Sequence, residues 1–444
     1  MISADRPIAD ERELLSDIFR AALRPIDPYR AVARHMDAIR SVYEKGGFSD
    51  LHVCAFGKAA PGMVRACMDS LGDILTNGVA VTKYGHWQEA PGDDRISMYE
   101  AGHPLPDENG VHAALEAMQM IRGLDEKSLL VCLISGGGSA LLVAPLAPVL
   151  FKEKQHTIDL LLRSGADIHE LNAVRKHISA VKGGRLAGMA FPARISSLIL
   201  SDVIDDRLDV IASGPFAPDE TTYGDALGVL DKYGLGAAVP RRVYDLLTSG
   251  AEGRIPETLK KGNPVFQKVD NTIVGNNEQA IAAAGRRCAE LGFAREVVAR
   301  GMRGEATDAA RWLAEKAREM RGRLRPGGKA VCLIAGGETT VTVRGQGVGG
   351  RNMELALAFA IHIEGEEGIT LLSAGTDGTD GPTDAAGAVV DGRTAQAARA
   401  AGLDPVKYLE DNNSYTFFKS AGGLFITGPT GTNVMDIQIL LLRP

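Results

Sequence analysis

Two apolar runs of this sequence end in glycine. Residues 131–142 read VCLISGGGSALL and residues 331–341 read VCLIAGGETTV. Glycine at the end of a buried strand allows backbone N–H groups to approach a ligand closely, and in α/β proteins that ligand is often an anion. We therefore predict ligand-binding loops that contain Gly136, Gly137, Gly138 and Ser139 in the first run, and Gly336 and Gly337 in the second.

A third glycine-rich stretch, GQGVGG, spans residues 345–350 and contains Gly347 and Gly349. It fits the GxGxxG pattern, follows the strand-like run TTVTVR and precedes a helical pattern, which is the setting of a dinucleotide fingerprint. Arg351 comes next, and a guanidinium at the start of a helix also suits a phosphate or a carboxylate. The motif alone leaves both interpretations open.

Lys58 follows the strand-like run CAFG and enters the next helical pattern. A lysine at the positive end of a helix dipole is unfavourable unless an anion is present, although position alone favours an exposed lysine. The pattern GxxxxGK[ST] occurs nowhere, which excludes a P-loop kinase.

Residues 171–187, LNAVRKHISAVKGGRLA, form a helical pattern with an apolar face. The opposite face alternates Arg175 and Lys182 with the short polar residues Asn172 and Ser179. One interpretation is a solvated surface, and the other is a binding site for an anion.

Aspartates cluster in SDVIDDRLD, from Asp202, and in GTDGTDGPTDAAG, from Asp377. Their spacing is not that of a calcium-binding EF-hand loop. Carboxylates at strand ends can hold Mg²⁺ or accept a hydroxyl proton, whereas capping of turns is their common local use. Cations, glycine loops and strand-end aspartates, without a zinc, thiol or serine-triad pattern, together favour phosphoryl transfer.

The elements that must position these residues alternate between strand-like and helical patterns. The pattern predicts an α/β fold with mostly parallel sheets and functional loops at the carboxyl ends of the strands. Residues 237–266, rich in proline and glycine, are the expected boundary between a domain at 1–240 and a second at 265–444. The strand-like runs are residues 51–58, 128–139, 196–202, 271–277, 330–337 and 369–378.

The composition, 24% charged and 45% hydrophobic with 5% aromatic residues, predicts a globular protein. The net charge of −7 argues against a nucleic-acid partner. The five cysteines fit neither a disulfide framework nor a zinc motif. No apolar stretch is long enough to cross a bilayer, so we expect a cytoplasmic protein without a membrane partner. The sequence is compatible with a homodimer but does not fix the oligomeric state.

Over nearly its whole length the sequence resembles the class II glycerate kinases, also called the MOFRL family. The resemblance rests on long motifs in a fixed order: AFGKAAPGM, EAGHPLPDENG, LISGGGSALL, LNAVRKHISAVKGGRLA, SDVIDD with ASGP, GGETTVTVRGQGVGGRNMELALAFA, LLSAGTDGTDGPTDAAG and GGLFITGPTGTNVMDIQI. One position departs from the family pattern, because Asp205 stands where members usually carry glycine.

The resemblance implies two α/β domains, a larger Rossmann-like N-terminal domain and a C-terminal MOFRL-type domain, with the active site in the cleft between them. It also implies that ATP, with Mg²⁺, phosphorylates the 2-hydroxyl of D-glycerate. The catalytic cations proposed for the family fall on Lys58 and Arg351.

On this basis we expect Lys58 and Arg351 to neutralise the transferring phosphoryl group, and Arg175 or Lys182 to hold the glycerate carboxylate. Asp202 would orient the acceptor hydroxyl or the metal, with Asp377 as a second candidate metal ligand. The alternative is an NAD(P)H-dependent hydroxypyruvate reductase that uses GQGVGG as its dinucleotide site. A non-catalytic sensor of small organic anions is a third reading, which would not need the aspartates.

Overall fold

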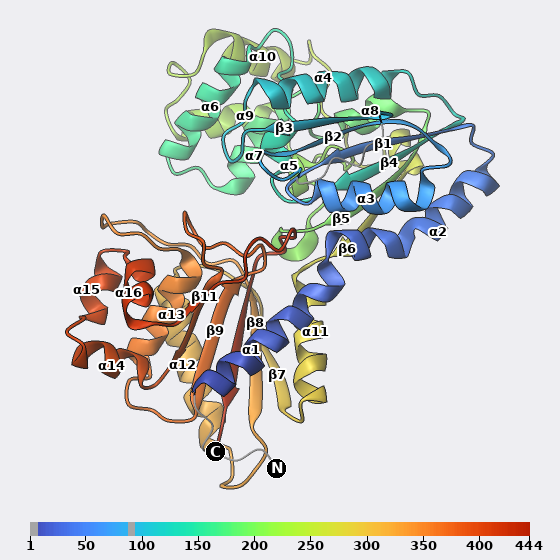
Figure 1. Ribbon diagram of the computed structural model, residues 1–444. Coiled ribbons are helices and arrows are strands. Elements are labelled where there is room, and N and C mark those ends of the chain that lie inside the picture. Colours follow the sequence, from blue (N-terminus) through green and yellow to red (C-terminus); the bar gives the residue numbers. More distant parts are fainter. Residues whose placement is uncertain (1–7, 88–93) are drawn as a thin grey trace. The chain divides into compact units, whose positions relative to one another are not determined.

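The computed structural model describes residues 8–87 and 94–444, which form two compact units. One unit is Pro28–Val274, and the other joins the residues up to Asp27 with Gly275–Pro444. Each contains a sheet covered by helices, so the predicted α/β fold class is confirmed (Figure 1). No helix in the described ranges is long and apolar enough to cross a membrane.

The strands of the Pro28–Val274 unit are β1 (Asp50–Phe56), β2 (Leu75–Lys83), β3 (Ile96–Ala101), β4 (Ser128–Ile134), β5 (Arg194–Leu200) and β6 (Val269–Gly275). Their order in the sheet is β3-β2-β1-β4-β5-β6, and β1 is parallel to both of its neighbours, β2 and β4. The direction of the chain order reverses between β1 and β4. In open α/β sheets, ligands bind beyond the carboxyl ends of the strands at such a reversal.

Helices cover both faces of this sheet: α2 (Pro28–Gly46), α3 (Ala60–Leu71), α4 (Glu108–Arg122) and α8 (Arg185–Ala190). Successive side chains of a strand point to opposite faces. Accordingly, Val53 and Ala55 of β1 pack in one core with α2 and α3, whereas Cys54 and Phe56 pack in another with α4 and α8. Figure 1 shows α3 and α4 on opposite sides of the strands. β1 is therefore buried on both faces, which fixes the loop that follows it.

The same unit has a second, all-helical core made by α6 (Phe151–Arg163), α7 (Ile168–His177), α9 (Tyr223–Lys232) and α10 (Arg241–Ala251). Leu161 of α6, Val174 of α7 and Leu247 of α10 are among its buried side chains. Because α10 packs here and β6 pairs in the sheet of this unit, residues 241–274 belong to it. The chain leaves it after Val274, later than the boundary region at 240–265 that we expected from proline and glycine content.

The strands of the other unit are β7 (Ala294–Met302), β8 (Val331–Gly337), β9 (Ile369–Gly375), β10 (Gly387–Asp391), β11 (Leu424–Phe425) and β12 (Asp436–Leu442). Their order is β11-β10-β9-β12-β8-β7. The sheet is mixed, because β12 pairs antiparallel with both β8 and β9 while β7 and β8 are parallel.

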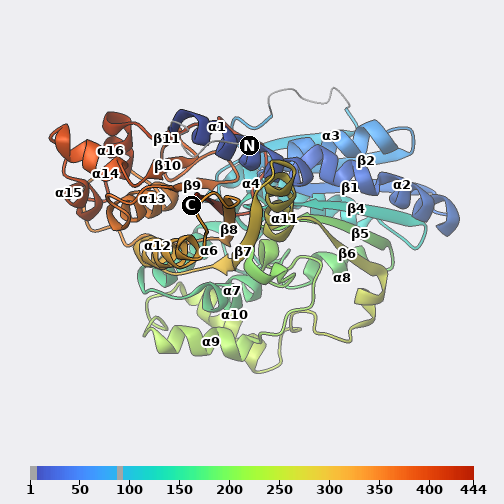
Figure 2. The ribbon, with the colours of Figure 1, turned by 90° about the horizontal axis from the view of Figure 1, so that it is seen from below.

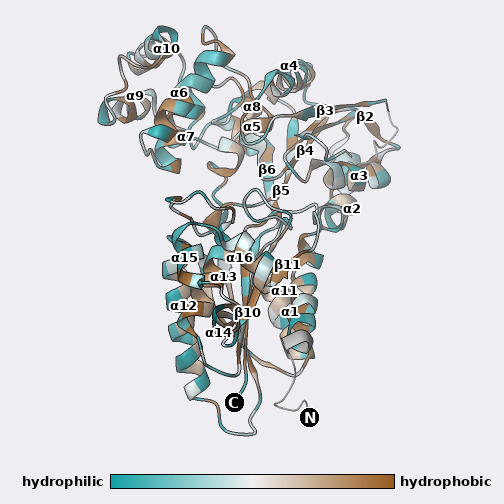
Figure 3. Ribbon diagram, turned by 60° about the vertical axis from the view of Figure 1, so that its left-hand side comes forward, coloured by the Kyte–Doolittle hydropathy of each residue, from teal (hydrophilic) through white to brown (hydrophobic). Residues whose placement is uncertain are grey.

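The helices of this unit are α1 (Ile8–Leu23), α11 (Asn277–Glu290), α12 (Ala306–Gly322), α13 (Arg351–His362), α14 (Thr394–Ala400), α15 (Pro405–Glu410) and α16 (Ser414–Ala421). One core contains side chains of α1 and α11, and the other contains side chains of α12 and α13. Figure 3 shows hydrophobic strands between these two pairs of helices.

Helix α1 packs in this unit although it is the first element of the chain. Figures 1 and 2 both show it beside α11. Glu11 accepts a hydrogen bond from Nε of Arg443 at 2.6 Å, and Asp17 accepts one from Nε of Arg287 at 2.7 Å. These ion pairs explain why residues up to Asp27 separate from the expected 1–240 domain.

Candidate active site

The loops after β1 and β4 are joined by hydrogen bonds at the reversal point of the sheet. The N–H of Lys58 donates to the carbonyl of Gly136 at 2.8 Å, and the N–H of Ala59 donates to Oγ of Ser135 at 3.0 Å. The predicted cation after β1 and the predicted glycine loop after β4 therefore lie side by side in one unit.

Neighbouring side chains explain why this loop consists of glycine. A Cβ on Gly136 would lie 2.0 Å from Oδ2 of Asp202, and a Cβ on Gly137 would lie 2.9 Å from Cδ2 of His103. Gly137 also has a φ of 85°, which L side chains rarely adopt. The glycines thus let Asp202, His103 and the loop converge at one place.

Two histidines, His86 and His103, lie near Lys58. Its Cγ would lie 3.3 Å from a Cβ on Gly137, and its carbonyl contacts Nδ1 of His86 at 3.0 Å. Burial, together with the charges of Lys58 and Lys83, lowers the pKa of His103 to about 4. Burial is the larger cause of this low pKa, and the two lysine charges add a positive contribution to the local potential that would favour an anion.

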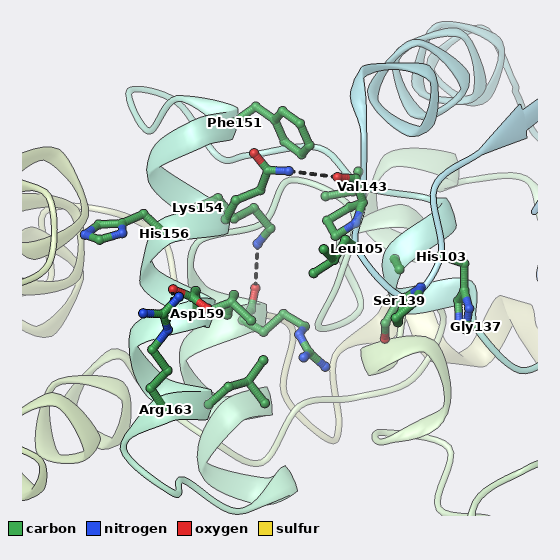
Figure 4. Close-up of a pocket in the computed structure, with 17 residues that line it drawn as sticks. His103, Leu105, Gly137, Ser139, Val143, Phe151, Lys154, His156, Asp159 and Arg163 are labelled. Atoms are coloured by element: carbon green, nitrogen blue, oxygen red, sulfur yellow. Dashed lines mark hydrogen bonds and ion pairs between the residues drawn. The ribbon is translucent and has the colours of Figure 1, made fainter. Parts of the chain in front are cut away.

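A pocket of about 550 Å³ opens beside this loop. Figure 4 shows Gly137, His103 and Ser139 along one side of it and helix α6 along the other. Arg175 of α7 also contributes to its lining. The pocket therefore brings together Gly137, Ser139 and Arg175, which we predicted as site residues from separate motifs.

Two buried lysines, Lys154 and Lys182, and the half-buried Arg175 lie at or next to this pocket. Nζ of Lys154 donates to the carbonyls of Arg175 and Ile178, both at 3.2 Å. Nζ of Lys182 donates to the carbonyls of Leu142 at 3.4 Å and Ala212 at 3.3 Å.

The positive charges of this group are not balanced by acids. Within the part of the chain that the structure describes, no carboxylate lies within 4.0 Å of the charged nitrogens of Lys154, Arg175 or Lys182. Burial, followed by the charge of Arg175, lowers the pKa of Lys182 to about 7. Burial, followed by the charges of Lys182 and Arg175, lowers the pKa of Lys154 well below its ordinary value. Uncompensated buried cations are costly, and an anionic ligand would remove that cost.

A chain of hydroxyl and amide groups connects the glycine loop to α7. Oγ of Ser139 lies 2.8 Å from Oγ of Ser213, which donates to Oδ1 of Asn172 at 3.0 Å. Ala212 and Ser213 have φ values of 50° and 61°, as does Asp205 at 68°. Asp205 thus occupies a turn in the left-handed region, where glycine is unstrained. Strained backbone held by such a network is typical of functional loops.

In the other unit, Arg351 at the start of α13 is held by two carboxylates. Its Nε and Nη2 donate to Asp436 at 2.6 and 2.9 Å, and its Nη1 lies 2.7 Å from Glu338. Burial lowers the pKa of Arg351, but the hydrogen bond and charge of Asp436 and the charge of Glu338 outweigh it and raise the pKa. Arg351 is therefore a rigidly oriented guanidinium, and one third of its side chain is exposed.

Glycines of the GQGVGG loop pack closely against residues 411–414 of the same chain. The N–H of Gly347 donates to the carbonyl of Asp411 at 2.9 Å, and a Cβ on Gly347 would lie 2.3 Å from Cβ of Asn413. A Cβ on Gly349 would lie 2.3 Å from Oγ of Ser414. This packing accounts for both glycines without a cofactor, so their cofactor-binding role stays a prediction that the loop geometry does not favour.

The setting expected of a dinucleotide fingerprint is also missing here. Residues 341–350 are all described and contain no strand, and the run TTVTVR forms only an isolated bridge from Thr340 to Glu305. At the start of α13, the N–H groups of Asn352 and Met353 donate to Asp380, at 3.1 and 2.8 Å. The helix terminus that a pyrophosphate would occupy is therefore capped by a carboxylate of the same chain.

We expect Gly345→Ala to destabilise the protein by about 1–3 kcal/mol, as overpacking of a well-packed site does. A Cβ on Gly345 would lie 2.3 Å from backbone atoms of Asp411, which cannot move as a side chain can. Chemical denaturation measures the effect. Gly322→Ala in α12 is the matched control, because a Cβ there meets nothing within 4 Å. Equal stabilities of the two variants would contradict the packing role of this loop.

Gly336 and Gly337 form the end of β8 and are also packed closely. A Cβ on Gly336 would lie 2.1 Å from Oδ1 of Asn277, and one on Gly337 would lie 2.1 Å from the backbone N of Met302. As with GQGVGG, internal packing explains these glycines, and their predicted contact with a ligand stays untested.

The two aspartates proposed for a metal lie in different units. Asp202 adjoins Gly136, and Oδ1 of Asp377 accepts the N–H of Thr379 at 3.0 Å. No group of three or more His, Cys, Asp or Glu side chains able to hold a metal occurs in residues 8–87 and 94–444. A single carboxylate still fits Mg²⁺, which proteins often bind through one or two carboxylates together with substrate phosphates.

Two site residues, Lys154 and His103, were not predicted from the sequence. Lys154 lies three residues after Phe151 and four before Ile158, on the apolar face of a helical pattern, and this placement was a usable signal. His103 follows β3, a short edge strand that we did not expect. Asp436 gave no local signal, because it pairs with a residue 85 positions away.

Two family models match separate parts of the chain. Residues 14–248 match the family described as "Domain of unknown function (DUF4147)", and residues 331–436 match the MOFRL family. A D-glycerate 2-kinase of Thermotoga maritima is 44% identical over 97% of this chain and 98% of its own length. A crystal structure of a Thermotoga maritima glycerate kinase superimposes with a TM-score of 0.86 at 43% identity, covering 98% of this chain and all of that chain. A putative hydroxypyruvate reductase of Agrobacterium vitis is 37% identical over 97% of this chain and 94% of its own.

Proposed function

The chain belongs to the glycerate 2-kinases of the DUF4147/MOFRL family, and from this premise we propose that it transfers the terminal phosphoryl group of ATP to the 2-hydroxyl of D-glycerate. In this reaction the hydroxyl oxygen forms a bond to phosphorus, the bond from phosphorus to the bridging oxygen breaks, and the hydroxyl proton is released. Catalysis depends mainly on positioning and on stabilisation of negative charge.

We propose that Arg175 and Lys182, with Ser139, hold the carboxylate of D-glycerate. One observation carries this assignment: the buried cations beside the glycine loop have no carboxylate partner among the described residues. Arg175 lines the pocket next to Ser139. A guanidinium can bind a carboxylate through two parallel hydrogen bonds, which also fixes the orientation of the acceptor hydroxyl.

Lys58 neutralises the phosphoryl group in this proposal. It follows β1 at the reversal point of the sheet, next to Gly136 and Gly137, whose lack of side chains leaves room for phosphate oxygens. Asp202, which adjoins Gly136, orients the acceptor hydroxyl. Arg351 supplies a second positive charge in an orientation fixed by Asp436.

Mg²⁺ is part of the proposal, with Asp202 or Asp377 as a protein ligand. When bound with the nucleotide it would neutralise charge on the phosphates. Both aspartates are half-buried, so each retains access to solvent.

The test is to incubate the protein with D-glycerate, ATP and Mg²⁺ and to follow the products by phosphorus NMR. The expected product is 2-phosphoglycerate, and 3-phosphoglycerate would overturn the proposed regiochemistry. Absence of any phosphorylated glycerate, together with oxidation of NADH or NADPH by hydroxypyruvate, would establish the reductase instead. The name of the Agrobacterium relative favours that alternative, whereas the capped start of α13 speaks against a dinucleotide there.

A further inference from the structure

The pocket beside the glycine loop has an apolar side that D-glycerate does not explain. This apolar wall consists of Leu105, Val143, Phe151, Ile158 and Leu162. The last three belong to α6, and Figure 4 shows this helix across the pocket from Gly137 and Ser139. Glycerate is a small, fully polar molecule and gains nothing from such a surface.

The size of the pocket also indicates a ligand larger than D-glycerate. About 550 Å³ falls within the range of roughly 300–1,000 Å³ that is usual for sites of drug-sized ligands and cofactors. Such sites are mostly apolar and carry a few well-placed polar groups. A ligand that fills this pocket must therefore have an extended apolar or aromatic part as well as a charged part.

The polar and charged groups of the pocket come from more than one element. Gly137 and Ser139 belong to the loop after β4, and Lys58 lies beside Gly137. Lys154 and Arg175 line the pocket as well, and their polar contacts are with carbonyl or amide oxygens of this chain. The pocket therefore combines apolar side chains with a glycine loop and with cations from α6 and α7.

We propose that this pocket binds the nucleoside of the phosphate donor, with the base on the apolar wall and the phosphates directed to Gly137 and Lys58. The inference rests on the proposed kinase function and assigns the donor to a defined place in the Pro28–Val274 unit. A nucleoside triphosphate has the two-part chemistry that the lining requires, because its flat base is apolar on both faces and its phosphates are anionic.

The variant Leu162→Glu tests this assignment, because it removes apolar surface and adds a negative charge to the wall. Leu162 is 54% exposed, so the fold should tolerate the change. Leu115→Glu on α4 is the matched control: Leu115 is 52% exposed and does not line the pocket. Calorimetry measures binding of a non-hydrolysable ATP analogue and, separately, of inorganic triphosphate, which has no base.

Leu162→Glu should weaken binding of the ATP analogue at least fivefold relative to Leu115→Glu. It should weaken inorganic triphosphate clearly less and leave KM for D-glycerate within twofold. Ile158→Trp, which fills the pocket without adding charge, should also weaken the analogue and spare triphosphate. Equal losses for the two probes, or a raised KM for D-glycerate with unchanged analogue binding, would overturn the proposal.

These results separate this inference from the kinase proposal. A wild-type protein that binds the analogue through the pocket but phosphorylates no glycerate would refute the kinase activity and support the pocket. A wild-type protein that forms phosphoglycerate while Leu162→Glu and Ile158→Trp both bind the analogue normally would support the kinase and refute the pocket.

Discussion

Replacing Lys58 by alanine is expected to lower kcat for glycerate phosphorylation by about 100-fold or more, the usual effect of removing one group that stabilises charge in a transition state. Lys58 follows β1, where its N–H is fixed by Gly136 and its side chain adjoins Gly137. Steady-state kinetics at saturating ATP and D-glycerate measure the effect. Thermal unfolding is measured in parallel, so that a loss of folded protein is distinguished from a loss of catalysis.

A second readout verifies that Lys58→Ala alters local charge without unfolding the site. Because Lys58 helps to lower the pKa of His103, the substitution should raise that pKa toward its ordinary value, which NMR titration of the imidazole detects. Lys127→Ala, at the exposed opposite end of the neighbouring strand, is the control and should retain full kcat. A Lys58→Ala enzyme with unchanged kcat would remove Lys58 from the mechanism.

Replacing Arg351 by alanine should have two large effects. It should lower the free energy of unfolding by about 3 kcal/mol, because the carboxylate of Asp436, 1% exposed, loses its bidentate partner. It should also lower kcat by about 100-fold if Arg351 stabilises the transferring phosphoryl group. Chemical denaturation and steady-state kinetics measure these two quantities independently.

The double variant Arg351→Ala with Asp436→Asn separates the two effects. Removing the orphaned charge should restore most of the lost stability, while kcat should remain low. Arg443→Ala is the matched control, because it breaks another buried ion pair of the same unit, with Glu11. It should reduce stability but leave kcat near the wild-type value at a temperature where the protein is folded. Recovery of kcat in the double variant would make Arg351 a structural residue.

Much of the Pro28–Val274 unit could be predicted from local sequence patterns. The strands β1, β4 and β5 are continuous apolar runs that end in small or polar residues, as buried parallel strands do. Lys58 and Gly136 could be placed at strand ends for that reason. The strands β2 and β3 were missed, because they contain polar residues and lie toward one edge of the sheet.

Residues whose role depends on distant partners could not be predicted. Gly347 matched a ligand-binding motif, yet its close neighbours are Asp411 and Asn413, which are remote in the sequence. The boundary near residue 240 failed to coincide with the compact units for the same reason: proline and glycine content reveals where the chain turns, but not that α10 returns to the core of α7 and α9. Local sequence determines which backbone conformations a segment prefers. The neighbours of Gly347 and the domain boundary depend instead on tertiary packing between distant segments.

The position of α1 has a consequence for synthesis on the ribosome. Its buried residues, such as Phe19, pack with β12, the last strand of the chain, and with Phe425. Translation at roughly 5–20 residues per second separates the emergence of these partners by tens of seconds. The Pro28–Val274 unit is complete before most of its companion unit has been made. The nascent chain must therefore keep an unpaired amphipathic helix in solution while a whole α/β unit folds behind it, which makes this helix a natural client for chaperones.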